Sequence, residues 1–267
     1  MVEPEVKSGI SKNLKARILS TICILPISIL AIWNGSWVFE SFIVLLGLFL
    51  MHEWNRLIGL SSINAISFVA SALVGVSVAL IWSPNPELGA FCLLGAIFFN
   101  LILGIKDARN NLLAFLGPIY IFLPCACIIW IREYPLVGLE LTLWLLIVVS
   151  TTDIAAYFFG KMIGGPRLAP RISPGKTWSG LFGGVICASL AGTLFGAVWF
   201  DFLFIDSAWE WGGFAILIAG TAQIGDLGES WLKRKMSVKD SGTVIPGHGG
   251  LLDRLDGFMV SSPLFTA

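Results

Sequence analysis

Charged residues are scarce in this sequence. Only 13% of its 267 residues are Asp, Glu, Lys or Arg, whereas a soluble domain averages about 25%. This scarcity excludes an ordinary soluble protein, because so apolar a surface would expose large patches and aggregate. Hydrophobic residues make up 56% of the chain, its mean hydropathy is +0.85, and apolar runs repeatedly approach the ~20 residues that cross a bilayer. These values predict an all-α, polytopic integral membrane protein.

Cysteine is also scarce, and its placement excludes most cysteine chemistry. The five cysteines all lie inside apolar runs: Cys23, Cys92, Cys125, Cys127 and Cys187. Cys125 and Cys127 are separated by one residue, not by the two residues of a metal-binding or redox pair. We therefore expect small packing residues without chemistry. The sequence also lacks a cleavage site after its first apolar run, so we expect that run to be a retained helix.

Nine apolar segments define the expected helices. The breaks between them include Asn34-Gly35-Ser36, Ser83-Pro84-Asn85-Pro86 and the Gly/Pro-rich stretch 164–175, all typical of turns. The segments are 18–33, 37–51, 63–82, 88–104, 112–131, 139–160, 180–200, 211–229 and 257–267. The last is short for a full span. We expect the first dozen residues of the chain to be disordered.

The distribution of basic residues predicts how these segments cross the membrane. With a cytoplasmic N-terminus and alternating spans, sixteen of the seventeen Lys and Arg residues fall on the cytoplasmic side, and only Arg132 falls outside. We therefore expect a multi-pass protein of the cell inner membrane or plasma membrane. Its parts are a cytoplasmic tail (1–17), N-terminal transmembrane helices (18–140) and a C-terminal transmembrane region (141–267) whose loops 161–179 and 230–256 converge on the cytoplasmic face.

Asp153 lies near the cytoplasmic end of an apolar segment. A carboxylate there is costly and usually faces a cation, a cavity or a basic partner. The hydroxyl groups of Thr151, Thr152 and Tyr157 are close in the sequence, which favours a functional site. The alternative is an interfacial acid paired with Lys161 or another base of the loop.

A second acidic position, Asp226, begins a polar helix face. Asp226, Glu229, Ser230 and Lys233 are spaced i, i+3, i+4 and i+7, so they share one side of a helix. An intrahelical pair of Glu229 with Lys233 would account for those two residues. It leaves Asp226, deep in an apolar helix, in need of a cation.

The loop between the sixth and seventh segments is basic and rich in glycine and proline. Arg167, Arg171 and Lys176 suit phosphate groups, and the turns can direct backbone N–H groups at an anion. Lys176-Thr177 precedes a helix, where anions bind well. The stretch is not a P-loop, because the first glycine is replaced by Pro170 and no strand precedes it. An ordinary cytoplasmic loop is the alternative.

The stretch 239–256 concentrates charges of both signs beside glycines. Asp253 and Asp256 are one helical turn apart and can face a shared site. Carboxylate oxygens suit Mg²⁺, which binds through a few carboxylates, waters and substrate phosphates. Glycines next to His248 allow the backbone to approach a ligand closely. This stretch predicts a site for phosphate and a divalent cation.

Taken together, these motifs resemble the signature of the phosphatidate cytidylyltransferase (CDP-diacylglycerol synthase) family. The signature runs through Ser230-Trp-Leu-Lys-Arg234, Lys239-Asp240, Pro246-Gly-His-Gly-Gly250 and Asp253-Arg-Leu-Asp256. Upstream, the family's other motifs are resembled by 153–160, 173–178 and 225–230. The similarity is clear over about residues 145–257, whereas over 1–140 it rests on hydrophobic topology. Two positions depart from the family pattern: Ser179 replaces an acid and Gly175 replaces a second base.

The resemblance implies transfer of the cytidylyl group of CTP to phosphatidate, which gives CDP-diacylglycerol and pyrophosphate for phospholipid synthesis. It also implies Mg²⁺, with room for a second cation, and a homodimer; no nucleic-acid partner is expected. The implied metal ligands are Asp226 and Asp253, assisted by Asp256 and Asp153. The implied catalytic residues are Asp226, Asp253, Lys233 and Arg254. The implied substrate-binding residues are Arg171, Ser173, Lys176, Thr177, Ser230, Arg234, Lys239, Asp240, Gly247, His248 and Gly249.

Two other functions remain open at this stage. A CTP-dependent transferase or kinase acting on another lipid, such as a polyprenol or an ether lipid, would use similar cytoplasmic motifs. An ion-coupled transporter would use Asp153 and Asp226 as a relay. Against a transporter, the charges gather at one face of the membrane, and no internal repeat is visible.

Overall fold

The computed structural model describes residues 6–60, 65–82, 84–107, 111–199, 208–242, 244–245 and 249–267. It separates into two compact units. Unit 1 comprises Met1–Pro118 with Lys239–Arg254, and unit 2 comprises Ile119–Val238 with Leu255–Ala267. Helices α5 (Asn111–Arg132) and α9 (Leu252–Thr266) each contribute residues to both units.

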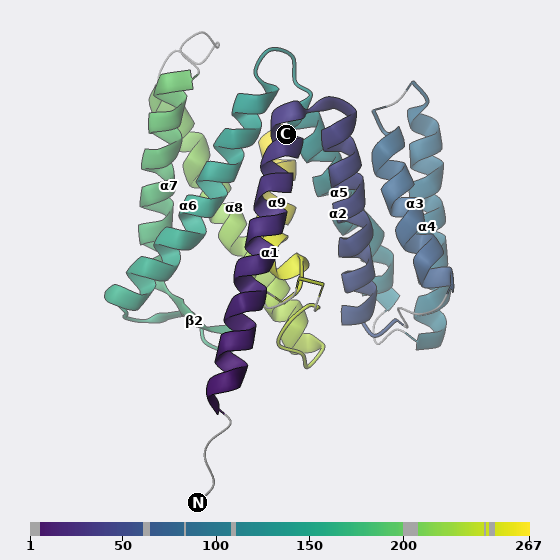
Figure 1. Ribbon diagram of the computed structural model, residues 1–267, viewed down its shortest axis with the longest axis horizontal. Helices are drawn as coiled ribbons and strands as arrows, with labels where there is room; N and C mark the ends of the chain where they lie inside the picture. Colours follow the sequence, from purple (N-terminus) through teal and green to yellow (C-terminus); the bar gives the residue numbers. More distant parts are fainter. Residues whose placement is uncertain are drawn as a thin grey trace, which may run out of the picture. The chain divides into compact units, whose positions relative to one another are not determined.

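Unit 1 contains the first four helices (Figure 1): α1 (Val6–Asn34), α2 (Ser36–Leu57), α3 (Ala65–Leu80) and α4 (Pro86–Asp107). Its centre is α2, whose Phe39, Leu50 and Trp54 side chains are buried. The Trp54 indole donates a hydrogen bond of 3.0 Å to the carbonyl oxygen of Leu113 in α5. A buried indole therefore fixes α2 against the start of α5 while satisfying its own N–H group.

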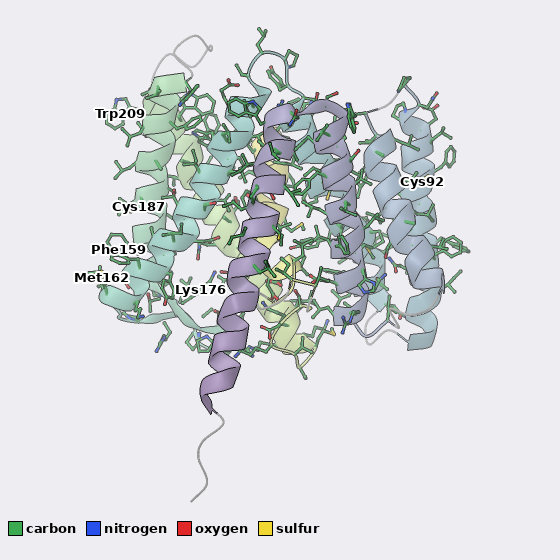
Figure 2. The ribbon with its side chains drawn as sticks, viewed as in Figure 1. Cys92, Phe159, Met162, Lys176, Cys187 and Trp209 are labelled. Atoms are coloured by element: carbon green, nitrogen blue, oxygen red, sulfur yellow. The ribbon has the colours of Figure 1, made fainter. Side chains whose placement is uncertain are left out.

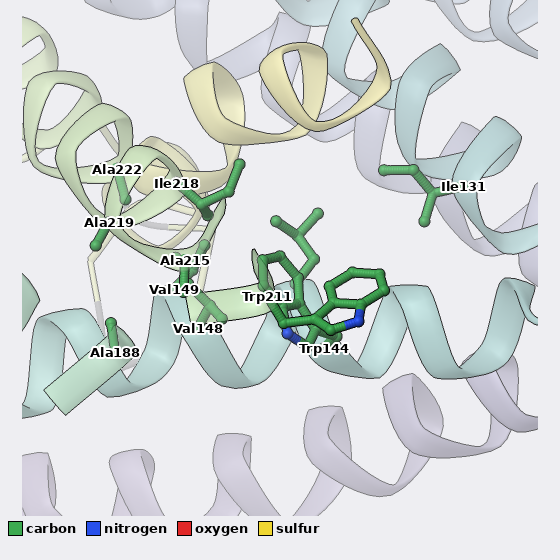
Figure 3. Packing of buried hydrophobic residues seen from close by; sticks show 11 residues of the cluster. Ile131, Trp144, Val148, Val149, Ala188, Trp211, Ala215, Ile218, Ala219 and Ala222 are labelled. Carbon is green, nitrogen blue, oxygen red and sulfur yellow. The ribbon is translucent and has the colours of Figure 1, made fainter. Parts of the chain in front are cut away.

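Unit 2 is built on three long helices and a short hairpin: α6 (Gly138–Met162), β1 (Arg167–Ala169), β2 (Ser173–Thr177), α7 (Trp178–Trp199) and α8 (Ala208–Lys235). The core lies around Trp144 of α6 (Figure 3), whose ring packs edge-on against Trp211 of α8 at a centroid distance of 5.4 Å. The Trp144 indole donates to the carbonyl oxygen of Gly192 in α7, 3.1 Å away.

Glycine lets α7 approach its neighbours closely. A Cβ atom on Gly192 would stand 2.7 Å from the Cβ of Ala215 and 3.3 Å from the Trp144 ring. A Cβ on Gly196 would overlap the side chain of Trp211 in the same way. Small residues at helix contacts are typical of membrane proteins, in which helices associate through close packing.

The predicted all-α fold is confirmed, and each of the nine predicted segments overlaps a helix of the described residues. Four of these helices in the described part, α2, α5, α6 and α7, are long and apolar enough to cross a membrane. Shorter apolar stretches are Ile22–Asn34, Val69–Leu80 and Pro86–Ile102. All five cysteines are free; Cys92 lies on α4 and Cys187 on α7 (Figure 2).

Two local expectations are wrong. The expected disorder of the first dozen residues does not hold from Val6 onward, where α1 begins. The loop between α6 and α7 contains a β-hairpin, because Arg167 pairs with Thr177 and Ala169 with Ser173 in an antiparallel ladder. Helical periodicity in the apolar segments gave no signal for so short a pair of strands. The backbone of the basic residues Arg167 and Lys176 is therefore held by strand pairing.

Candidate functional site

The hairpin and the start of α7 form a continuous structure. Thr177 ends β2 and accepts a hydrogen bond of 3.1 Å from the backbone N–H of Gly180 through its Oγ1 atom. A threonine hydroxyl in this position caps a helix by satisfying one of the N–H groups that lack an intrahelical partner. The predicted placement of Lys176-Thr177 before a helix is therefore confirmed, with Lys176 in β2 and Thr177 as the cap.

Ser179, one of the two departures from the family pattern, takes part in the same cap. Its Oγ atom lies 3.0 Å from Thr177 Oγ1 and donates to the carbonyl oxygen of Gly164 at the entry to the hairpin. At the other departure, a Cβ atom on Gly175 would meet nothing within 4 Å. The serine has a local structural role, and the glycine lies in open space.

A polar network connects the hairpin to α8 within unit 2. Lys176 Nζ (Figure 2) lies 2.6 Å from Asp226 Oδ2 and donates to Gln223 Oε1 at 3.1 Å. The Gln223 amide in turn donates to Asp153 Oδ1 of α6 at 3.4 Å. The network therefore joins two carboxylates and one ammonium group from three separate elements. Its centre, Gln223, is buried.

The network settles which partners the two acids take. Asp226 has the cation that its position required, and that cation is Lys176. Asp153 contacts Gln223, whereas Lys161 lies over the Tyr157 ring, 5.7 Å from its centroid. The lysine ammonium balances the charge of the Asp226 carboxylate through a charge-assisted contact.

The predicted polar face of α8 is confirmed. Ser230 Oγ donates to Asp226 Oδ1 at 3.4 Å, and Lys233 Nζ donates to Glu229 Oε2 at 3.2 Å. The second contact is the intrahelical pair that the spacing predicted. Arg234, predicted to bind substrate, donates from Nε to the carbonyl oxygen of Ile172 at 3.3 Å. This bond holds the hairpin turn against α8.

Asp256 joins this group where α9 crosses α8. A Cβ atom on Gly225 would overlap the carbonyl oxygen of Asp256, so the two backbones touch. The electrostatic neighbours of the Asp256 carboxylate include the carboxylates of Glu229 and Asp226. Three carboxylates therefore gather at one crossing. In the described residues no three His, Cys, Asp or Glu side chains are arranged to hold a metal ion.

A separate group of predicted residues lies in the signature loop, defined here as residues 239–254 of unit 1. Asp253 Oδ2 accepts hydrogen bonds of 3.0 Å from the backbone N–H groups of Ser241 and Gly250. Ile245 and Gly249 pair in a single bridge, with Gly249 at a φ of 86°, a value that favours glycine. Ser241 and Gly250, on either side of the bridge, are therefore both bound to the Asp253 carboxylate.

The carboxylate of Glu53 supports the signature loop from α2. Its Oε2 atom accepts a hydrogen bond of 2.9 Å from the backbone N–H of Leu252. Sequence reasoning missed Glu53, and it missed Gln223. An acid beside the apolar segment 37–51 was a signal for the first, and an amide three residues before Asp226 on the polar face was a signal for the second.

Of the other predicted substrate-binding and catalytic residues, most of those that the structure describes are exposed. Lys239, Asp240 and Arg254 are exposed in unit 1, and Arg171 is exposed in the hairpin turn, while Ser173 is half-buried at the start of β2. Gly247 and His248 lie outside the described residues. Asp253 belongs to unit 1, whereas Asp153, Asp226 and Asp256 belong to unit 2. The convergence of the two loops and the shared metal set remain predictions.

Comparison with known proteins places the whole chain among similar sequences. A family model described as the cytidylyltransferase family matches residues 15–267. A phosphatidate cytidylyltransferase of Brucella suis is 35% identical over 254 residues, which cover 94% of this chain and 92% of the relative. One of Staphylococcus epidermidis is 31% identical over 264 residues, covering 94% and 97%. The similarity therefore extends into the N-terminal helices, where the motifs alone left only hydrophobic topology.

Proposed function

Since this chain belongs to the cytidylyltransferase family, we propose that it transfers the cytidylyl group of CTP to phosphatidate, giving CDP-diacylglycerol and pyrophosphate. The relatives from Brucella suis and Staphylococcus epidermidis are named for this activity, and this chain aligns with nearly their whole length. The observation that carries the proposal for this chain is the network of Lys176, Gln223 and Asp226. The network fixes the position of the Lys176 ammonium group in a protein that has few charged residues.

The reaction requires little covalent help from the protein. An oxygen of the phosphatidate phosphate attacks the α-phosphorus of CTP, and the bond from that phosphorus to the bridging oxygen of the β-phosphate breaks. The nucleophile is already anionic, so no strong general base is needed. The obstacle is repulsion between two anions. Catalysis of such transfers rests mainly on positioning and charge neutralisation.

The basic side chains of unit 2 suit this task. Lys176 and Lys233 are each held by one carboxylate, Asp226 and Glu229 respectively. An ammonium group kept beside a carboxylate is oriented and ready to exchange that partner for a phosphate oxygen. In this proposal Lys176 and Lys233 bind phosphates, and Arg254 and Lys239 add charge from the signature loop.

Mg²⁺ suits the carboxylates of this site. Mg²⁺ in nucleotide enzymes is usually held by one or two carboxylates together with substrate phosphates and water, so a complete protein cage is not required. Asp226 already binds one cationic group, the ammonium of Lys176. Asp256 is among the electrostatic neighbours of Asp226. We propose that these two hold Mg²⁺, with Asp153 assisting and Asp253 as a further ligand from the signature loop. When bound, Mg²⁺ would neutralise charge on the triphosphate.

We place the reaction on the cytoplasmic face of the inner or plasma membrane. The support is the placement of sixteen of seventeen basic residues on one side of the predicted topology. CTP would arrive from the cytoplasm and phosphatidate sideways from the bilayer. The family resemblance supports a homodimer, which light scattering of the purified protein would test.

The deciding experiment uses purified protein in lipid nanodiscs with phosphatidate, Mg²⁺ and CTP labelled at the α-phosphorus. We expect label in CDP-diacylglycerol and equimolar release of pyrophosphate. CTP labelled at the γ-phosphorus is the matched control and should leave the lipid unlabelled. Label in the lipid from the γ-position would indicate a kinase, and vesicle counterflow without label in any lipid would indicate a transporter. Either result would refute the proposal.

A further inference from the structure

Glu53 is a fully buried carboxylate in unit 1. Its exposed fraction is 0%, although it lies near the end of α2, in a segment where the sequence motifs indicated no function. Burying a carboxylate costs several kcal/mol unless hydrogen bonds compensate it. The buried carboxylate therefore requires a hydrogen-bond donor. That donor belongs to the signature loop, 199 residues away in the sequence.

The contact is made with backbone. Glu53 Oε2 accepts from the N–H of Leu252 at 2.9 Å, the first residue of α9. The N–H groups in the first turn of a helix have no intrahelical acceptor and carry partial positive charge. A carboxylate is therefore a favourable partner there. Next to it, Gly250 N–H donates to Asp253, so two carboxylates together fix the start of α9.

Glycines of the loop are shaped to fit Glu53. A Cβ atom on Gly242 would overlap Glu53 Oε1, and one on Gly250 would lie 2.9 Å from Glu53 Oε2 and overlap Ser241 Oγ. The loop backbone thus lies directly on the carboxylate. Within the residues that the structure describes, Glu53 Oε1 and Ser241 Oγ are buried atoms with no hydrogen-bond partner. The fit therefore depends on shape and on the one backbone bond.

We propose that Glu53 is a positioning residue, which holds the signature loop in place through Leu252 N–H and so sets Asp253 for the reaction. The catalytic consequence rests on the proposed function, whereas the hold on the loop does not. The role is one of hydrogen bonding, so an uncharged acceptor of the same size can replace the carboxylate.

The first test measures the loop without turnover. Hydrogen exchange of the full chain in nanodiscs should be on the order of tenfold faster in peptides covering 239–254 for Glu53→Ala, because a buried N–H loses its acceptor. Glu53→Gln should restore most of the protection. Glu40→Ala, in the same helix, is the matched control and should leave exchange unchanged. Unaltered exchange in Glu53→Ala, or no rescue by glutamine, would overturn the inference.

The second test measures turnover. With Mg²⁺, phosphatidate and CTP, Glu53→Ala should raise KM for CTP by about tenfold, and Glu53→Gln should stay within about threefold of wild type. A merely unstable protein would lose active fraction, hence kcat, while its KM stayed constant; that result would overturn the positioning role. If the wild-type protein were inactive toward these substrates, the proposed function would be refuted instead. The hydrogen-exchange measurement would then still test whether Glu53 holds the loop.

A third variant, Gly242→Ala, changes the loop side of the contact, and unaltered loop exchange in this single variant would overturn the inference even where Glu53→Ala fails to fold. Gly242→Ala places a methyl group on Glu53 Oε1 and should speed exchange of the loop by itself. Combined with Glu53→Gln, which leaves the same bulk, it should remain fast; combined with Glu53→Ala, which removes the bulk, it should be no worse than Glu53→Ala alone. Strict additivity of the alanine pair would show that the two residues do not act on each other and would overturn the inference.

Discussion

The polar region of unit 2 and the signature loop of unit 1 are each stabilised by a different kind of hydrogen bond. In unit 2, Lys176, Gln223 and Asp226 bind one another through side chains. In unit 1, Glu53 and Asp253 accept hydrogen bonds from the backbone. A side chain can exchange its partner for a phosphate without disturbing the fold, whereas a loop that loses its backbone partners loses its shape.

Solvent exposure follows the same division. The side chains of Lys176 and Asp226 are 18% and 31% exposed, so a ligand can reach them. Glu53 is 0% exposed, so a soluble ligand cannot. Carboxylates in one small protein therefore serve two purposes. That of Asp226 in α8 suits contact with a charged substrate, and that of Glu53 in α2 suits support of the signature loop.

The largest expected effect comes from removing the acid at the centre of the exchangeable network. Asp226→Asn keeps the shape of the side chain but loses the charge that holds Lys176. Cytidylyl transfer should fall by about 10³-fold, measured as CDP-diacylglycerol formed in nanodiscs. Glu210→Gln, at the other end of α8, is the matched control and should keep its activity. An active Asp226→Asn protein would remove Asp226 from the catalytic set.

The next effect tests the backbone-held loop. In Gly250→Ala the new methyl group would overlap Ser241 Oγ and stand 2.8 Å from the backbone nitrogen of Gly242. Overpacking of this kind typically costs about 1–3 kcal/mol, so SDS-induced unfolding should occur at a lower SDS fraction, and activity should fall. Gly213→Ala, where nothing lies within 4 Å, should unfold like wild type. Equal behaviour of the two variants would contradict the close fit of the loop.

A smaller effect is expected at the bridging amide. Gln223→Leu keeps the volume but removes the acceptor of Lys176 and the donor to Asp153. We expect kcat/KM to fall roughly tenfold, since buried polar groups lose their partners, with the protein still folded. Thr221→Val in the same helix is the control, because the Thr221 hydroxyl bonds only to its own helix among the contacts described. Unchanged kcat/KM in Gln223→Leu would show that the amide does not orient Lys176.

The smallest effect is expected at the helix cap. Thr177→Ala removes the hydroxyl that accepts from Gly180 N–H, which should lower the free energy of unfolding by about 1 kcal/mol. Thr177→Ser keeps the hydroxyl and should restore it. SDS unfolding followed by tryptophan fluorescence measures both. If alanine and serine unfold alike, the cap does not stabilise α7.

Much of the fold was predictable because it depends on local composition. Apolar runs interrupted by Gly, Pro and Asn predicted that each helix exists, for example 139–160 for Gly138–Met162. They missed polar helix ends, since α1 begins at Val6 and α8 continues to Lys235. Helical spacing also predicted the contacts of Asp226 with Ser230 and of Glu229 with Lys233. The hairpin at Arg167–Thr177 was missed, because two strands this short leave no alternating pattern.

Local sequence was enough to predict an apolar helical protein, since hydropathy and turn residues act over a few neighbouring positions. Motifs of fixed spacing were enough to indicate the family. Which partner each buried charge takes became known from the three-dimensional fold. Lys176 meets Gln223 across 47 residues and Glu53 meets Leu252 across 199, and such pairings depend on how whole helices pack, which no local pattern encodes.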